Sequence, residues 1–145
     1  VLVIGFFWIF YGTPIHNLNL WIVERNFYSA NIEHPVGSTL LEKKIYLGGP
    51  ATHGSSQCIY AVGEIRATQF DKNKIKEAYQ NKYIRFWGIQ LPLRVIFKDE
   101  VNGLYEMPFV IWQDELREMH NVPGTPYIIY AATSNHYLGD LRCDD

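Results

Sequence analysis

The richest cluster of potentially reactive side chains is His53-Gly54-Ser55-Ser56-Gln57-Cys58, near the middle of the chain. A cysteine nucleophile requires a nearby histidine to form its thiolate, and an Asn or Asp to orient that histidine. His136, with Asn135 or Asp140, could supply both groups. However, we expect Cys58 to open a strand, whereas the nucleophile of cysteine hydrolases usually opens a helix. A cysteine-dependent hydrolase using Cys58 and a histidine is therefore an alternative hypothesis.

The same segment supports a second alternative, a soluble ligand-binding or inhibitor-like module. His53, Ser55, Ser56 and Gln57 could form its binding loop, although they identify no small-molecule ligand. The glycine-flanked elbow of serine hydrolases, Gly-x-Ser-x-Gly, does not occur here. Loop hydroxyl groups more often make hydrogen bonds within turns. We therefore predict no catalytic serine.

The five histidines are dispersed, and none of them is paired at the i, i+4 spacing of a helical metal site. They are His16, His34, His53, His120 and His136. Neither cysteine has a ligand-spaced histidine or a second cysteine beside it, so a zinc site is not expected. We predict no metal site and no cofactor.

Cys58 and Cys143 are the only cysteines of the chain. In a protein outside the cytosol, two such residues predict one disulfide. This bridge would pin the C-terminal tail to the middle of the domain and remove Cys58 as a nucleophile. Two buried free thiols are the alternative.

Composition favours a folded domain and argues against a nucleic-acid partner. Aromatic residues make up 15% of the 145 residues, and disordered chains lack such residues. The formal net charge is −2, and the Lys and Arg residues are scattered. Because nucleic-acid binding needs a basic face, we do not expect it.

The N-terminal segment is unlike the rest of the chain, because Val1–Val23 contains no Asp, Glu, Lys or Arg. Its front part, Val1–Tyr11, has no strongly polar side chain, and Gly12-Thr13-Pro14 marks a break. This pattern predicts a membrane anchor. The expected membrane or partner contacts are Phe6, Phe7, Trp8, Phe10, Tyr11 and Trp21.

Several arrangements of the anchor are open. A helix completed by residues before Val1 could end near Tyr11-Gly12, or one helix could run through a kink at Pro14. A signal peptide is a further alternative, although no small-x-small cleavage site follows the apolar run closely. The last alternative is a buried segment of a soluble core. A second helix, capped by Thr13 and running from Pro14 to about Tyr28, would be amphipathic. It could lie on the membrane or dock onto the domain.

We predict residues 1–28 as the apolar membrane-anchor segment plus amphipathic helix, and residues 29–145 as a single α+β globular domain. The domain should hold a small, mainly antiparallel sheet and one main packed helix, preceded by the N-terminal apolar membrane helix. The expected strands are 40–47, 58–69, 91–98, 105–112 and 127–133. The expected main helix is 72–84, and one or two helical turns are expected at 114–120.

Three local patterns support these elements. Asp71 is an N-cap candidate for the helix. Asn102-Gly103 predicts a hairpin turn between strands 91–98 and 105–112. Along 58–69, one side carries small apolar residues, which suggests packing against a helix, and the other side turns polar at its end, which suggests emergence into solvent.

The favoured function is that of a non-catalytic, membrane-tethered accessory or interaction protein. We expect its domain on the extracytoplasmic side, in the periplasm or outside the cell. Its partners would be membrane lipid and other membrane or envelope protein subunits.

Overall fold

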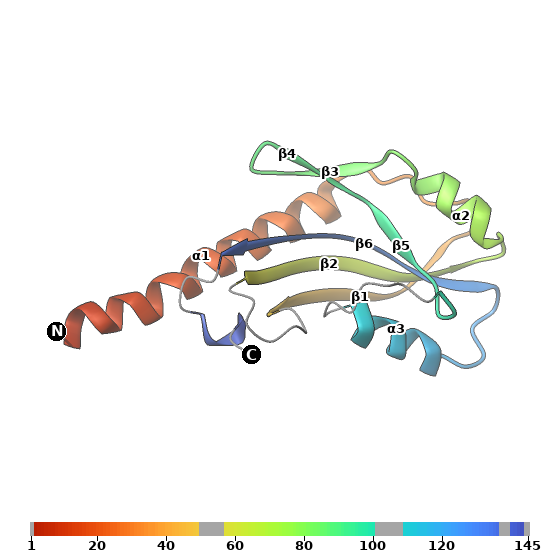
Figure 1. Cartoon of the computed structure of the whole chain (residues 1–145). Helices are drawn as coiled ribbons and strands as arrows, with labels where there is room; N and C mark the ends of the chain where they lie inside the picture. Colours follow the sequence, from red (N-terminus) through yellow and green to blue (C-terminus); the bar gives the residue numbers. More distant parts are fainter. Residues whose placement is uncertain (1, 50–56, 101–108, 137–139, 144–145) are drawn as a thin grey trace.

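The computed structural model describes residues 2–49, 57–100, 109–136 and 140–143. The elements are α1 (Leu2–Ser29), β1 (Thr39–Gly48), β2 (Gln57–Thr68), α2 (Lys72–Tyr79), β3 (Tyr83–Phe86), β4 (Ile89–Pro92), β5 (Arg94–Ile96), α3 (Phe109–Glu118), β6 (Thr125–His136) and a 3-10 turn, η1 (Leu141–Cys143). Four strands form one antiparallel sheet in the order β1-β2-β6-β5, while β3 and β4 form a separate hairpin (Figure 1). The α+β class with a mainly antiparallel sheet is confirmed.

The two central strands, β2 and β6, pair from end to end, with Gln57 opposite His136 and Thr68 opposite Thr125. Close backbone approach accompanies this pairing. A Cβ atom on Gly63 would lie 2.7 Å from the carbonyl oxygen of Ile129. Only glycine fits that position without a shift of the neighbouring strand.

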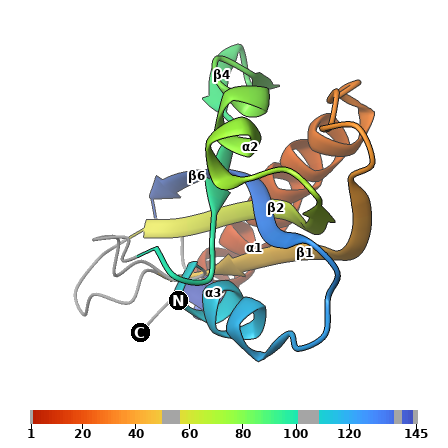
Figure 2. The same ribbon diagram turned by 90° about the vertical axis from the view of Figure 1, so that its right-hand side faces the viewer.

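Helices α1 and α3 cover opposite faces of the sheet (Figure 2). On one face, Val23 and Phe27 of α1 pack in a core cluster with Tyr60 and Val62 of β2. On the other face, α3 packs against the small side of β2, which confirms the helix contact predicted there. Its buried residues Phe109, Trp112 and Leu116 follow the spacing of an amphipathic helix. Two helices thus cover the sheet, rather than the one expected.

The strand predicted over 105–112 is wrong where the structure describes it, because α3 begins at Phe109. Phe109-Val110-Ile111-Trp112 is a short apolar run, and such runs do not distinguish a strand from a buried helix. The predicted turn at Asn102-Gly103 lies outside the described residues. The expected strand 91–98 is divided into β4 and β5, with Leu93 between them.

Helix α2 has its predicted N-cap, since the Asp71 carboxylate accepts a hydrogen bond from the Lys74 amide at 3.0 Å. The helix ends at Tyr79 instead of near Ile84. Asn81 adopts a left-handed conformation with φ +61°, which the helix cannot continue through. The chain then enters the β3–β4 hairpin, which the sequence analysis missed.

Helix α1 runs without interruption from Leu2 to Ser29 and contains Pro14 inside it. The break expected at Gly12-Thr13-Pro14 is therefore wrong, and the alternative of one helix running through Pro14 is observed. The C-terminal half of α1 docks onto the sheet through Val23 and Phe27, while its N-terminal end projects past the sheet (Figure 1). Within the described residues, no helix has a stretch long and apolar enough to cross a membrane.

Candidate functional site at the base of the N-terminal helix

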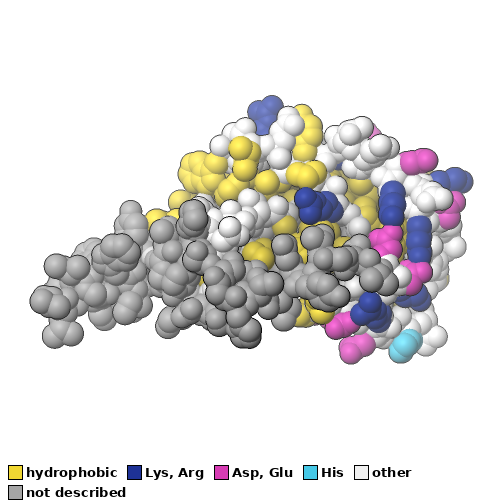
Figure 3. All heavy atoms as spheres, viewed as in Figure 1, with side chains coloured by type: hydrophobic (Ala, Val, Ile, Leu, Met, Phe, Trp, Pro, Cys, Tyr) yellow, Lys and Arg dark blue, Asp and Glu magenta, His cyan; other side chains and the backbone are white. Residues whose placement is uncertain are grey.

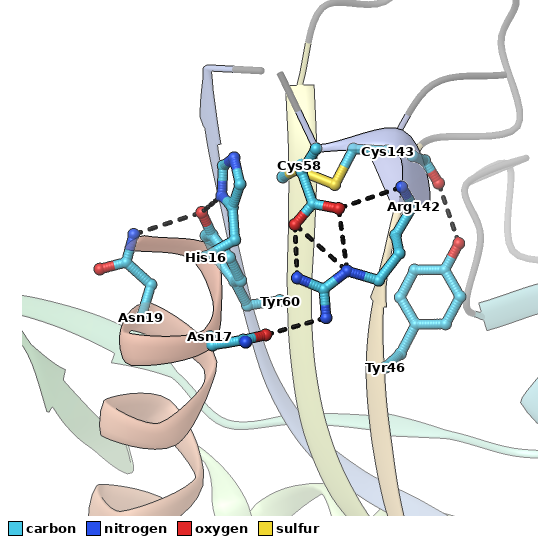
Figure 4. Close-up of a disulfide and its surroundings, with 10 residues drawn as sticks. His16, Asn17, Asn19, Tyr46, Cys58, Tyr60, Arg142 and Cys143 are labelled. Atoms are coloured by element: carbon cyan, nitrogen blue, oxygen red, sulfur yellow. Dashed lines mark hydrogen bonds and ion pairs between the residues drawn. A yellow bond between two sulfur atoms is a disulfide. The ribbon is translucent and has the colours of Figure 1, made fainter. Parts of the chain in front are cut away.

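The projecting half of α1 meets the domain at a junction of three elements, α1, β2 and η1 (Figure 4). A disulfide joins Cys58 at the start of β2 to Cys143 in η1, with the two Cα atoms 5.1 Å apart. Both residues are buried. The predicted bridge is confirmed, and the alternative of two free thiols is wrong. In the disulfide-bonded protein, Cys58 has no thiolate that could act as a nucleophile.

Arg142 connects the bridged tail to α1. Its guanidinium donates to the Asn17 side-chain oxygen at 2.8 Å and also to the carboxylate of Asp140. Asp140 is buried, and its hydrogen bonds from Arg142 hold the pKa of its carboxyl below the ordinary value. The tail is thus held covalently to β2 and by a charged hydrogen-bond network to α1.

His16 and Asn19 fasten the same turn of α1 to the sheet. His16 is fully buried, and its Nδ1 atom lies 2.5 Å from the Tyr60 hydroxyl. The Asn19 side-chain amide donates to that hydroxyl at 3.2 Å, so the hydroxyl proton is available to His16 Nδ1. Burial lowers the pKa of His16 and favours the neutral ring that this arrangement requires.

The His16 ring proton then lies on Nε2, which is buried and has no hydrogen-bond partner among the described residues. These polar groups of α1 were not predicted as site residues from the sequence. The sequence contains a signal for them, because the polar residues His16 and Asn19 are spaced three apart on the face of α1 that also carries Val23.

A second polar network lies under the C-terminal end of α1. Arg66 of β2 donates to Glu64 at 2.6 Å and to the Ser38 hydroxyl at 2.9 Å. Ser38 contacts the Tyr127 hydroxyl at 2.9 Å. Glu64 is only 7% exposed, so the prediction that this side of the strand emerges into solvent is wrong. Thr68, farther along, is buried as well.

Tyr79 extends the network to the α1–β1 connection. Its hydroxyl lies 2.9 Å from the Tyr127 hydroxyl and 2.8 Å from His34 Nδ1. Burial raises the pKa of Tyr79 and lowers that of His34, so both groups are neutral at pH 7. The network contains no activated nucleophile. Its buried polar groups satisfy one another, which is the usual structural solution for such groups.

A shallow groove of 770 Å³ lies between α2 and the segment that joins β4 to β5. Lys76, Lys82 and Arg94 line it. Two of these cations already have partners, since Lys76 pairs with Glu100 and the Lys82 ammonium donates to the Glu33 carbonyl. Only the contact with Glu100 offsets a positive charge, but Glu77 also lines the groove, so the lining carries a small excess of positive charge and forms no concentrated anion site.

The outward side of α1 continues the apolar character of the N-terminal segment. Trp21, a predicted contact residue, is 50% exposed, and the Arg25 guanidinium lies 5.2 Å from its ring centroid. Hydrophobic side chains also gather over the β3–β4 hairpin, beside the base of the projecting arm (Figure 3). Trp87, in the turn of this hairpin, is exposed.

The other predicted site residues are not brought together by the described structure. The backbone of Phe6, Phe7, Trp8, Phe10 and Tyr11 is helical in α1, but their side chains lie outside the described part of the chain. In the proposed binding loop, His53, Ser55 and Ser56 also lie outside it, and Gln57 is an exposed residue at the start of β2. Within the described residues, no three His, Cys, Asp or Glu side chains are grouped as metal ligands.

Comparison of the chain with protein-family models, with curated proteins and with solved structures finds no match. The functional argument therefore depends on the geometry of the junction and of the surface around it.

Proposed function

We propose that this chain is a non-catalytic, membrane-tethered interaction protein with its α+β domain on the extracytoplasmic side. There it would contact membrane lipid and other membrane or envelope proteins. The observation that carries the proposal is the projecting N-terminal half of α1. The sequence Val1–Tyr11 contains no charged residue, and the sheet does not extend beside these turns (Figure 1).

An apolar helix of this kind is unfavourable in water unless something covers it, and no described strand of the sheet lies beside it (Figure 1). The four consecutive large residues Phe6–Ile9 make the cost high. The helical stretch from Leu2 to Tyr11 rises about 15 Å, which is about half of the ~30 Å hydrocarbon core of a bilayer. The proposed tether is the insertion of this segment, which by itself would reach across about one leaflet.

The disulfide supports the extracytoplasmic placement. Bridges such as Cys58–Cys143 form and persist in oxidising compartments and are rare in the cytosol. The bridge also holds the tail against α1, through the contact of Arg142 with Asn17. This arrangement stiffens the base of the arm, so an inserted α1 would hold the domain in a defined orientation.

Vesicle flotation tests the tether. The chain is mixed with phosphatidylcholine vesicles and centrifuged through a density gradient, alongside the double variant Phe6→Glu/Phe10→Glu and the control Val36→Glu. Val36 is 86% exposed on the α1–β1 connection, away from the arm. We expect the unaltered chain and the Val36→Glu variant to float with the vesicles and the double variant to remain at the bottom. An unaltered chain that remains at the bottom contradicts the proposal.

The compartment has its own test. Intact cells are treated with a thiol-alkylating reagent before lysis, and the mass of the unreduced protein is measured. We expect Cys58 and Cys143 to be unmodified and bridged. Alkylation of both cysteines would refute the extracytoplasmic placement while leaving the vesicle result unaffected.

A further inference from the structure

The turn of the β3–β4 hairpin contains an unusual residue. Phe86 pairs with Ile89, so the loop has two residues, Trp87 and Gly88, with φ values of +46° and +84°. This is the geometry of a type I′ turn, in which Asn-Gly is the favoured sequence. A bulky aromatic residue at the first position is disfavoured, because its Cβ atom crowds the backbone in the left-handed region.

Burial does not explain the tryptophan, because Trp87 is 66% exposed. A strained and exposed aromatic residue at a hairpin tip suggests a contact outside the domain. Ile89, the first residue of β4 after the turn, is 54% exposed. Exposed apolar side chains therefore occupy both the turn and the strand that leaves it.

The hairpin is fixed along α1 by two hydrogen bonds. The Trp87 indole N–H donates to the Asn19 side-chain oxygen at 2.9 Å. The Asn26 side-chain amide donates to the Arg85 carbonyl at 2.6 Å. The hairpin tip is therefore held beside the part of α1 that lies nearest to the projecting arm.

The turn of α1 that binds Trp87 also carries exposed apolar side chains. Leu18 precedes Asn19 and is exposed, and Trp21 follows it on the same side of the helix, three residues from Leu18. We call Leu18, Trp21, Trp87 and Ile89 the hairpin–helix patch. Neither the segment 1–23 nor the hairpin 83–92 contains an acidic residue.

We propose that the hairpin–helix patch enters the headgroup layer of the membrane beside the inserted arm, an inference that rests on the proposed function. Tryptophan and arginine side chains are favoured at membrane interfaces. Trp21 carries Arg25 above its ring, and Arg85 lies one residue before Phe86 in the hairpin. Continuity with the apolar segment Val1–Tyr11 selects the bilayer as the occupant of this surface.

This contact requires α1 to be strongly tilted. Asn19, which binds Trp87, lies eight residues after Tyr11, or about 12 Å along the helix axis. The headgroup layer is only about 5 to 8 Å thick on each side of the bilayer. An upright helix would therefore hold Trp87 above the headgroups, whereas a tilt of about 50° or more brings the patch into them.

The test compares vesicle partition coefficients of three variants, measured on phosphatidylcholine vesicles over a lipid titration. Trp87→Asn replaces the tryptophan with the residue that a type I′ turn favours, so the hairpin is expected to fold. Ile89→Thr removes a second patch residue and retains a β-branched side chain. Tyr83→Thr is the matched control, because Tyr83 is 46% exposed on the same hairpin but lies at its open end, opposite Pro92.

We expect about tenfold weaker partitioning for Trp87→Asn, and a smaller loss for Ile89→Thr. The control Tyr83→Thr should partition as the unaltered chain does. Circular dichroism of each variant checks its folding. If Trp87→Asn and Ile89→Thr are folded and partition like the unaltered chain, the inference is wrong. The same holds if Trp87→Asn changes only the oligomeric state, since the patch would then bind protein.

The two proposals fail separately. An unaltered chain that does not bind vesicles overturns the proposed function itself. Binding that is abolished by Phe6→Glu/Phe10→Glu but unchanged by Trp87→Asn and Ile89→Thr overturns only the role of the hairpin–helix patch.

Discussion

Removal of the disulfide should cost a large part of the stability of the domain. Cys58 and Cys143 are 85 residues apart in the sequence, and the bridge closes a loop of that length in the unfolded chain. In the chain-entropy model, this closure contributes roughly 4.5 kcal/mol at 25 °C. The total stability of a domain is typically about 5 to 15 kcal/mol. The double variant Cys58→Ala/Cys143→Ala should therefore retain its fold only marginally or lose it.

Urea unfolding followed by circular dichroism measures this effect. For an m-value of about 2 kcal/mol per molar urea, the midpoint should fall by about 2 M. Addition of a reducing agent should lower the midpoint of the unaltered chain similarly, and should leave that of the double variant unchanged. A decrease of less than about 0.5 M would refute the reasoning, because the bridge would then not restrict the unfolded chain as the model requires.

Three further predictions concern the domain and are measured by urea unfolding. Asp71→Ala should lower the free energy of unfolding by about 1 kcal/mol, since it removes the hydrogen bond to the Lys74 amide; no loss would contradict the capping role. Gly63→Ala should cost about 1 to 3 kcal/mol, because its Cβ atom would lie 2.7 Å from the Ile129 carbonyl oxygen; an unchanged midpoint would show that this approach is not restrictive. Burial lowers the pKa of His16 in the folded chain. As the pH falls below about 6.5, the unfolded chain therefore binds a proton at this residue before the folded chain does, and the free energy of unfolding should decrease. His34 acts in the same direction, so the discriminating result is a smaller loss between pH 7 and pH 5 in His16→Gln than in the unaltered chain.

The elements that the sequence predicted correctly are those in which local pattern and tertiary environment agree. The alternation along β2 placed Tyr60 and Val62 on one face and Ala61 and Ile65 on the other, and the two core clusters divide them in this way. Asp71 was identifiable as an N-cap because capping depends only on the residues that follow it. The disulfide followed from the presence of only two cysteines.

The wrong predictions depend on contacts between distant segments. Pro14 removes one amide donor from α1, yet α1 continues through it, and its C-terminal half gains the packing of Val23 and Phe27 against the sheet. The polar end of β2 is buried because Arg66 reaches Ser38, 28 residues earlier in the chain. A hydrophobic pattern within one segment contains no information about such partners.

The site shows the same division. Trp21 was identified as a contact residue from its place in an uncharged segment, and it is half exposed. Trp87 could not be assigned to the same surface, because its position depends on the hairpin and on its hydrogen bond to Asn19, 68 residues away. His16 was considered only among the dispersed histidines, whereas its burial against Tyr60 places it in the domain.

Fluorescence quenching of Trp8 by phosphatidylcholine brominated in the acyl chains tests the insertion of α1 most directly. A Trp21→Phe/Trp87→Phe variant retains Trp8 and Trp112, and the latter is buried in α3 on the far face of the sheet. A second variant that also carries Trp8→Phe retains Trp112 alone. At saturating lipid, we predict strong quenching in the first variant and almost none in the second. Equal and negligible quenching in both would contradict the insertion of the N-terminal half of α1 into the membrane.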